Sequence, residues 1–410
     1  MSGLAAGAWL GAAEAPTKLV TLGLSPFLIS LAMVAGVFVA RWTVPTVLKG
    51  SGYVWLDLSE KPHLLIWAVV AGALWAVANT LTVFAIRDVG LSIAFPLWNT
   101  NSLVGLLWGW LFFRELRGAG LGGWAKVAGG GAAIVLGAIL LAYASSHQSA
   151  AMPQRAAAGI LAAIGAGLLW GTMYIPYRKA YLSGMNPLSF VTVFTVGELV
   201  TMTTLALVFR GGLGPLMEEI GKARPALFWL FLGGFFWVLG DLFQQYAAKY
   251  IGIGRGIPLS NTNQLWGLGW GALVFGELSG QGSVNLSLIV TGSIVMILGA
   301  VAISSAVAPA NEQISWREAV TRECNRYGLD AARASAAAAG EDPLGNVTAR
   351  FRWWDAAILL AAVGVFLVLA RWAERPPIKM SVAWTALLVT ATLALLIACG
   401  RLLWKRTKFS

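Results

Sequence analysis

The sequence predicts an all-α integral membrane protein with two inverted five-helix repeats and two further helices, about twelve spanning helices in total. The first observation is composition, because 58% of the 410 residues are hydrophobic, only 11% are charged, and the mean hydropathy is +0.73. These values lie far from those of soluble globular proteins. The second observation is that the apolar runs are continuous and about 20 residues long, as in membrane-spanning helices, and do not alternate as in a membrane barrel.

Each apolar run is a candidate spanning helix, because a helix can satisfy its backbone hydrogen bonds within the lipid. In chain order the twelve predicted spans are 3–22, 25–48, 63–86, 89–113, 122–145, 157–182, 187–209, 225–249, 252–276, 284–306, 354–373 and 381–403.

An internal repeat organises the first ten spans. Residues 96–118 and 258–280 share 15 identities in 23 positions at an offset of 162, and the same offset pairs Trp75 with Trp237 and Asn79 with Asp241. Spans 1 and 2 match spans 6 and 7 more loosely, at offsets of 160 or 161. We therefore expect one five-helix unit over 1–146 and a second over 157–306. Because five is odd, the second unit is inverted, which is typical of secondary transporters; the alternative is that two copies merely build a stable bundle.

The rest of the chain falls outside this repeat. Residues 307–352 are polar and are expected to form a cytoplasmic connector with a short helix, and 353–410 carry two additional spans and a basic tail. Only eight residues precede Trp9, whereas about 14 residues of the matching span precede Trp170. We therefore expect that helix 1 is short or that the true start lies upstream.

The net charge of +11 favours a lipid surface as partner and not nucleic acid, because Lys and Arg lie at span ends and in the tail. Ten of them fall on one side of the first ten spans and six on the other, which places both termini in the cytoplasm of an inner (plasma) membrane protein. No cleavable signal peptide is recognised. With two cysteines, Cys324 and Cys399, the sequence indicates no disulfide framework, metal site or cofactor.

Polar residues inside spans 4 and 9 are the candidate substrate site. The repeat places Asn99, Thr100 and Asn101 at positions equivalent to Asn261, Thr262 and Asn263, which Gln264 follows. Pro96 and Pro258 stand three residues before the clusters, where they remove backbone donors. Amides and hydroxyls offer donors and acceptors to a neutral polyhydroxylated solute. Trp75 and Trp237 are candidates for stacking or sealing, with Asn79 as a further polar group. The alternatives are interhelical hydrogen bonding for the amides and the lipid interface for the tryptophans.

Intramembrane carboxyl groups are candidates for proton coupling, because a charge at the bilayer centre costs about 2.5–3.5 kcal/mol on insertion scales. They are Glu14, Glu198 and Asp241. The alternative is a static network with Arg41, Arg178 or Arg255. Glu115 and Glu277, which end spans 4 and 9, are expected to cap or gate.

Residues 241–277, DLFQQYAAKYIGIGRGIPLSNTNQLWGLGWGALVFGE, resemble the glucose/ribose porter family of the drug/metabolite transporter superfamily. The matching residues are Phe243, Gln244, Ala247, Ile251, Gly252, Pro258, Ser260, Gln264, Leu265, Phe275, Gly276 and Glu277. Residues 170–187 are also similar to this family. The resemblance covers about residues 1–306 and implies the ten-helix, five-plus-five fold and uptake of a monosaccharide with a proton, with Gln244 as a further solute contact. The NTN triplet and the last two spans depart from the family pattern.

These observations predict a secondary active transporter of a small neutral polar solute, with monosaccharide uptake by proton symport as first choice. An exporter of metabolites or cationic drugs is the alternative transporter. A membrane scaffold is the non-transport alternative. A sugar or lipid transferase is disfavoured, because the chain carries no paired acidic motif and no catalytic histidine constellation. We therefore expect that the protein is not an enzyme.

Overall fold

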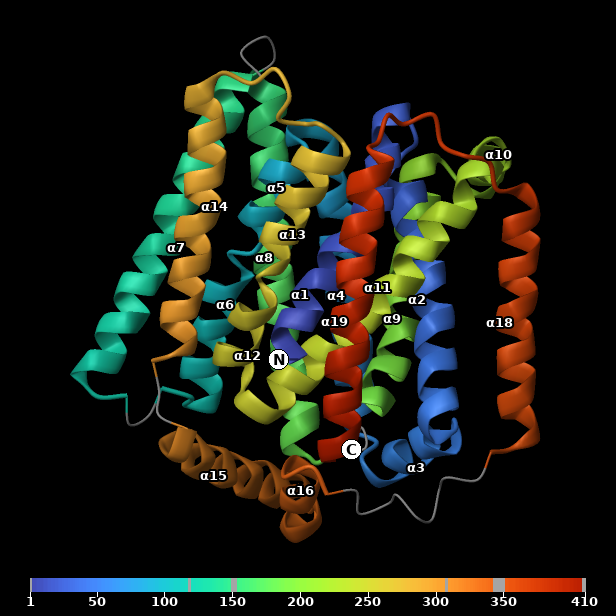
Figure 1. Cartoon of the computed structure of the whole chain (residues 1–410). Helices are drawn as coiled ribbons and strands as arrows, with labels where there is room; N and C mark the ends of the chain where they lie inside the picture. Colours follow the sequence, from blue (N-terminus) through green and yellow to red (C-terminus); the bar gives the residue numbers. More distant parts are fainter. Residues whose placement is uncertain (1, 117–118, 149–152, 307–308, 342–350, 408–410) are drawn as a thin grey trace.

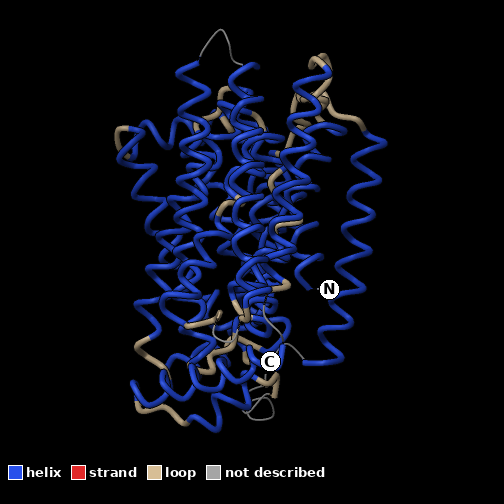
Figure 2. Tube along the Cα trace, turned by 90° about the vertical axis from the view of Figure 1, so that its left-hand side faces the viewer, coloured by secondary structure: helices blue, strands red, loops and turns tan. Residues whose placement is uncertain are grey.

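The computed structural model describes residues 2–116, 119–148, 153–306, 309–341 and 351–407. The regular elements in these ranges are all helices (Figures 1 and 2). Within them, nine helices are long and apolar enough to cross a membrane. These are α2 (Pro26–Lys49), α4 (Leu64–Val89), α7 (Leu121–Gln148), α8 (Pro153–Leu182), α9 (Pro187–Arg210), α11 (Arg224–Ile251), α14 (Ser283–Ser304), α18 (Trp353–Trp372) and α19 (Val382–Thr407). The prediction of an all-α membrane protein is confirmed.

Three predicted spans are not single helices. The first is α1 (Ser2–Ala13) followed by the 3-10 helix η1 (Ala15–Leu22). The fourth is α5 (Leu91–Trp98), α6 (Asn101–Trp108) and the π-helix η2 (Gly109–Phe113), and the ninth is α12 (Ile253–Ser260), α13 (Asn263–Gly269) and the π-helix η3 (Trp270–Val274). The expectation of an unbroken helix is wrong here, because proline removes a backbone donor and asparagine and threonine favour turns.

Short helices mark the two ends of the molecule. Helix α10 (Leu213–Lys222) joins α9 to α11 at one end, and α15 (Pro309–Tyr327) and α16 (Ala331–Ala338) lie at the other, near α3 (Gly52–Glu60) (Figure 1). We call these the α10 end and the α15 end. The connector therefore holds two helices where one was expected; its residues 342–350 lie outside the described residues.

Close packing of small residues joins the long helices in the middle of the bundle. Helix α2 packs against α9 and α11, and α4 packs against α8 and α9. Gly36 of α2 and Gly234 of α11 approach the partner helix so closely that a β-carbon would meet a backbone carbonyl, and Gly72 of α4 and Gly197 of α9 do the same. Such contacts let two membrane helices approach closely.

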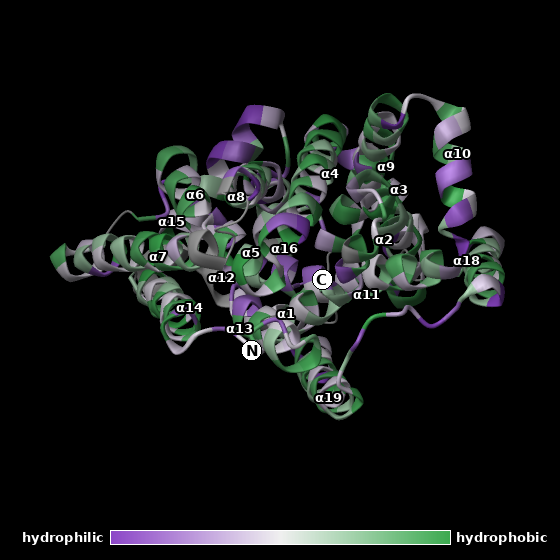
Figure 3. Cartoon of the chain, turned by 90° about the horizontal axis from the view of Figure 1, so that it is seen from above, coloured by the Kyte–Doolittle hydropathy of each residue, from purple (hydrophilic) through white to green (hydrophobic). Residues whose placement is uncertain are grey.

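Helices α18 and α19 lie at the periphery and bury little of their surface (Figures 1 and 3). At the start of α18, Asp355 accepts a hydrogen bond from the Ser51 amide (3.1 Å), and after its end the Glu374 amide donates to the Pro225 carbonyl (3.1 Å). Helix α19 packs against α1 and η3. Figure 3 shows hydrophobic residues over α7, α14 and α19, as expected for helices that face lipid.

Candidate functional site

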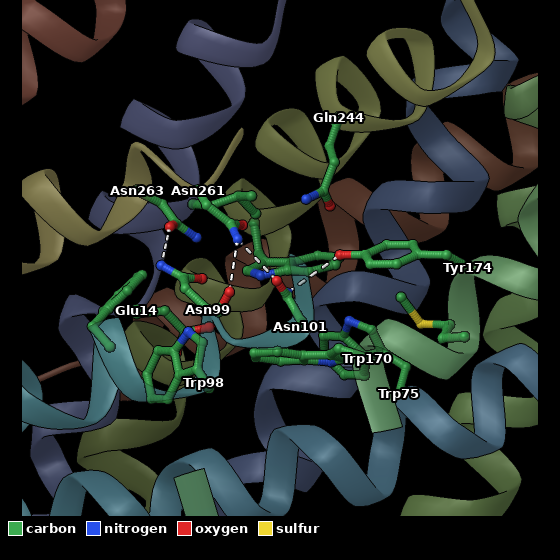
Figure 4. A pocket seen from close by; sticks show the side chains of 14 residues that line it. Glu14, Trp75, Trp98, Asn99, Asn101, Trp170, Tyr174, Gln244, Asn261 and Asn263 are labelled. Carbon is green, nitrogen blue, oxygen red and sulfur yellow. Dashed lines mark hydrogen bonds between the residues drawn. The ribbon is translucent and has the colours of Figure 1, made fainter. Parts of the chain in front are cut away.

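The two breaks in the helices meet at one place. Asn99 and Thr100 form the turn between α5 and α6, and Asn261 and Thr262 form the turn between α12 and α13. The Asn99 side-chain amide donates to Asn263 Oδ1 (2.7 Å). The Asn261 amide donates to Asn101 Oδ1 (2.9 Å) and to the Asn99 carbonyl (3.0 Å) (Figure 4). The four amides therefore join the two breaks in this conformation.

Glycines on α1 and α8 allow other helices to reach the breaks. A β-carbon on Gly7 or Gly11 of α1 would collide with the α12–α13 segment, at Thr262 and Trp266. A β-carbon on Gly167 of α8 would lie 2.7 Å from both Thr100 Oγ1 and the Trp98 carbonyl. Each turn is thus held against the backbone of a neighbouring helix, which positions the asparagines.

A cavity of about 30 Å³ lies beside these amides. Its lining residues are Leu10, Glu14, Trp75, Phe95, Trp98, Asn99, Asn101, Trp170, Met173, Tyr174, Trp237, Gln244, Asn261 and Asn263. This volume is close to that of one water molecule, whereas pockets for small ligands span about 300–1,000 Å³. The surrounding helices must therefore move apart before a solute can enter.

Aromatic rings form much of the wall. The rings of Trp75 and Trp237 meet edge to face at 4.9 Å, and those of Trp98 and Trp170 at 5.9 Å. Tyr174 lies on the far side of the cavity from Asn263, with its hydroxyl 3.4 Å from the Asn101 amide (Figure 4). Rings of this kind stack on the C–H face of a sugar or surround a cation.

Glu14 is the one acidic side chain in this wall among the described residues. It lies at the junction of α1 and η1, is 2% exposed, and its Oε2 atom has no hydrogen-bond partner within the described part of the chain. A buried carboxyl group with an unpaired oxygen is costly unless it is protonated or meets a ligand.

A second charged cluster lies beside Trp237, among residues that do not line the cavity. Arg41 Nη2 of α2 binds Asp241 Oδ2 of α11 at 2.5 Å, and Arg41 Nη1 lies 3.9 Å from Glu198 Oε1 of α9. The Arg41 guanidinium also lies 5.5 Å from the centre of the Trp237 ring. All three charged side chains are almost completely buried. Arg41 is therefore the positively charged partner of both Asp241 and Glu198.

One ion pair at each end of the molecule involves a residue that follows a broken helix. At the α10 end, Lys18 binds Glu277, which also accepts hydrogen bonds from the Leu91 amide (3.1 Å) and the Ser92 amide (2.9 Å) at the start of α5. Burial acts to raise the pKa of Glu277, but Lys18 and the hydrogen bonds from Ser92 hold it below its ordinary value. At the α15 end, Arg178 Nε lies 3.0 Å from Glu115 Oε1.

The structure brings together eight of the fourteen predicted site residues. Those that line the cavity are Asn99, Asn101, Asn261, Asn263, Trp75, Trp237, Gln244 and Glu14. Those that lie elsewhere are Thr100, Thr262, Gln264, Asn79, Glu198 and Asp241. Thr100 instead donates to the Leu97 carbonyl (2.9 Å) within its own turn, and Gln264 and Asn79 are buried away from the cavity. Arg41 pairs with Asp241, in agreement with the static alternative for that carboxyl group.

Six lining residues were not among the predicted site residues. They are Leu10, Phe95, Trp98, Trp170, Met173 and Tyr174. The repeat contained one usable signal for these residues. At an offset of 160, Leu10 matches Trp170 and Glu14 matches Tyr174, so each of these two pairs joins two lining residues. The apolar members carry no signal that separates a cavity wall from ordinary helix packing.

No protein-family model matches the chain, and no curated protein shows significant similarity to it.

Proposed function

We propose that the chain is a secondary active transporter of a small neutral polar solute, most readily a monosaccharide taken up with a proton. The observation that carries this proposal is that two interrupted helices, at positions that match in the sequence, meet through asparagine amides at one cavity. Discontinuous helices that meet near the bilayer midplane are how many transporters build their binding site.

Helix contacts support two inverted five-helix units. Gly36 packs on the Phe231 carbonyl and Gly197, 161 residues later, packs on the Val69 carbonyl. Likewise Gly234 packs on the Met33 carbonyl and Gly72 on that of Phe194. The sequence offsets of 160–162 thus relate the contacts of one half to those of the other, as expected for two units about a pseudo-two-fold axis.

In the proposed cycle the ion pairs Lys18–Glu277 and Glu115–Arg178 act as alternating gates. Both are formed here and the cavity is too small for a solute, so this conformation is an occluded state. Opening one end parts the two helix breaks, and the amide–amide hydrogen bonds are replaced by hydrogen bonds to solute hydroxyls. Trp75 and Trp237 stack on the solute.

Of the three predicted proton carriers, Glu14 suits the role best. It lines the cavity, whereas Asp241 is bound to Arg41 and Glu198 is not among the lining residues. Its protonation state is therefore coupled to the solute through direct contact. Asp241 and Glu198 form a buried network around Arg41.

One observation favours a second candidate, an exporter of cationic solutes. Four tryptophans and one carboxyl group line the cavity, and aromatic rings around a carboxylate suit a cation. In this alternative Glu14 binds the solute and does not carry a proton.

The test is uptake into proteoliposomes of labelled monosaccharides and of a labelled quaternary ammonium compound, with and without a proton gradient. For the sugar symporter we expect gradient-driven accumulation that is lost in Asn261→Ala/Asn263→Ala and in Asn99→Ala/Asn101→Ala. Glu14→Gln should lose accumulation but retain sugar counterflow. Cation transport that Glu14→Gln abolishes, without sugar uptake, would establish the second candidate. Folded protein that transports neither class would contradict both.

A further inference from the structure

A second cavity lies at the α10 end, away from the asparagines. It has a volume of about 620 Å³ and lies between the first turn of α2 and the ends of α4, α8 and α9. Three arginines line it, Arg87 of α4, Arg155 of α8 and Arg210 of α9, together with Glu219 of α10. Nothing in the transport cycle described above uses these residues.

The arginines keep unused hydrogen-bonding capacity. Arg87 binds Asp88 through Nε and Nη2 (2.7 and 2.9 Å), and Arg155 Nε binds the same carboxylate (3.0 Å). Arg210 Nε binds Glu219 (2.5 Å). Each guanidinium has five N–H donors. Within the described residues, both Nη atoms of Arg155 and Arg210 make no protein hydrogen bond, and three cations face two carboxylates. The three arginines together with Asp88 and Glu219 carry one net positive charge, which favours an anion.

The cavity has an aromatic wall that continues onto the lipid-facing surface. Phe27 and Phe84 line it, and the Phe27 ring stacks on Phe209 at 4.8 Å. Phe209 is 61% exposed. Along α9, Val196, Val200 and Val208 are exposed on one helix face, which also carries the exposed Thr204. We call these three valines the valine stripe of α9; it reaches the end of the helix that carries Phe209 and Arg210.

Helix α10 places this cavity at the height of the lipid headgroups. Leu213 and Met217 are exposed apolar residues of this helix, whereas Glu218 and Lys222 are exposed charges. Its sequence is strongly amphipathic, and such helices lie in the membrane interface. Figure 3 shows its hydrophilic and hydrophobic turns beside α9.

We propose that this cavity binds the phosphate of an anionic phospholipid, with an acyl chain along Phe209 and the valine stripe of α9. Guanidinium groups suit phosphate because their planar N–H donors match its oxygens. A free phosphate would bind the guanidinium groups in the same way but would make no contact with the valine stripe.

The test is native mass spectrometry of the full-length protein with phosphatidylglycerol, phosphatidylcholine or inorganic phosphate. We expect retention of phosphatidylglycerol over phosphatidylcholine, weakened about tenfold or more in Arg155→Gln/Arg210→Gln, as for two lost charge-assisted contacts. Lys222→Gln, which removes a positive charge from the same face but outside the cavity, is the matched control and should bind normally.

A second variant separates lipid from free anion without touching the ion pairs. Phe209→Ala should weaken phosphatidylglycerol binding while the arginines remain. Equal retention of the two lipids, or displacement of phosphatidylglycerol by millimolar inorganic phosphate, would overturn the proposal in favour of unspecific lipid or a free-anion site. Normal binding by Phe209→Ala would likewise overturn the acyl-chain path. None of these outcomes depends on transport activity.

Discussion

The surroundings of Trp75 and of Trp237 differ, although the two residues stand 162 positions apart and their rings touch. Close to Trp237 on α11, Asp241 binds Arg41 at 2.5 Å and accepts a hydrogen bond from Gln245 at 2.7 Å. The Tyr181 hydroxyl in turn donates a hydrogen bond to Gln245. The repeat pairs Asp241 with Asn79 and Arg41 with Met202, and the Thr80 hydroxyl contacts the Met202 sulfur. The two tryptophans are therefore matched in the sequence, whereas the charged residues Arg41 and Asp241 correspond to the uncharged Met202 and Asn79.

The two ends of the molecule differ in a similar way. Glu277 is held by Lys18 and by amides at the start of α5, all within residues 1–306. Arg178, the partner of Glu115, also lies 3.9 Å from the centre of the Trp316 ring, and neighbouring Lys179 binds Glu323 (3.0 Å). Trp316 and Glu323 belong to α15, which the repeat does not contain. Helix α15, which lies outside the repeated sequence, thus contacts the ion pair at one end of the molecule.

The largest expected effect follows from removing the buried cation. Arg41→Met leaves Asp241 and Glu198 buried without a positive partner, and breaking such a pair costs about 3–5 kcal/mol. Thermal and denaturant unfolding in detergent measure this loss. Arg41→Met/Asp241→Asn introduces the residues found at the two matching positions, Met202 and Asn79, and should recover much of the stability.

The control for this experiment is Met202→Leu, a swap of similar volume that should cost less than about 1.5 kcal/mol. If Arg41→Met unfolds at the same temperature as the native protein, the charged cluster is not the stabilising network inferred here.

The second prediction compares the two proposed gates, Lys18–Glu277 and Glu115–Arg178. In a cysteine-free background carrying Met173→Cys in the cavity wall, Glu277→Gln should raise labelling by an impermeant maleimide from the α10 end about tenfold. Glu115→Gln should do so from the α15 end. Replacing a carboxylate removes charge-assisted hydrogen bonds, and about 1.4 kcal/mol corresponds to a tenfold change. Equal labelling from both ends in each variant would argue against two separate gates.

The sequence predicted the long helices well, because continuous apolar runs of spanning length have few alternatives. It missed the short helices α3 and α10, whose polar residues resemble loops in a hydropathy profile. Within the candidate site it singled out Asn99 and Asn261, since polar residues in an apolar span are conspicuous. It could not separate Phe95 or Met173 from ordinary packing residues. The sequence also could not show that Asp241 pairs with Arg41, because that pairing depends on the orientation of α2 and α11 about their helix axes.

A smaller effect is expected from α15. Trp316→Ala removes a cation–π contact worth about 0.5–2 kcal/mol, while Arg178 keeps Glu115. Labelling of Met173→Cys from the α15 end should rise by about threefold, less than for Glu115→Gln. Trp353→Ala, which removes an exposed tryptophan at the start of α18, is the matched control and should leave labelling unchanged. An increase from the α10 end would contradict the assignment of α15 to one gate.

The smallest expected effect is a pH dependence of α15 docking. The ring of His63, just before α4, stacks on Tyr327 of α15 at 3.9 Å. Burial lowers the pKa of His63 below its ordinary 6.5. The nearby Glu323 acts to raise this pKa, whereas Lys179 and Lys61 lower it further. The docked state therefore favours the neutral imidazole. Its contribution is complete above about pH 6.5 and is lost as the pH falls through the lowered pKa.

Hydrogen exchange of the α15 amides at pH 7.5 and pH 5.5 measures this loss, with His63→Gln compared at each pH so that the intrinsic pH dependence of exchange cancels. At pH 5.5 the native protein should lose about twofold more protection than the variant, since the imidazole is partly exposed and its shift is screened. Equal changes in the two proteins would mean that His63 does not report on docking. In that case the ion pair between Lys179 and Glu323 and the contact of Trp316 with Arg178 hold α15 in place independently of pH.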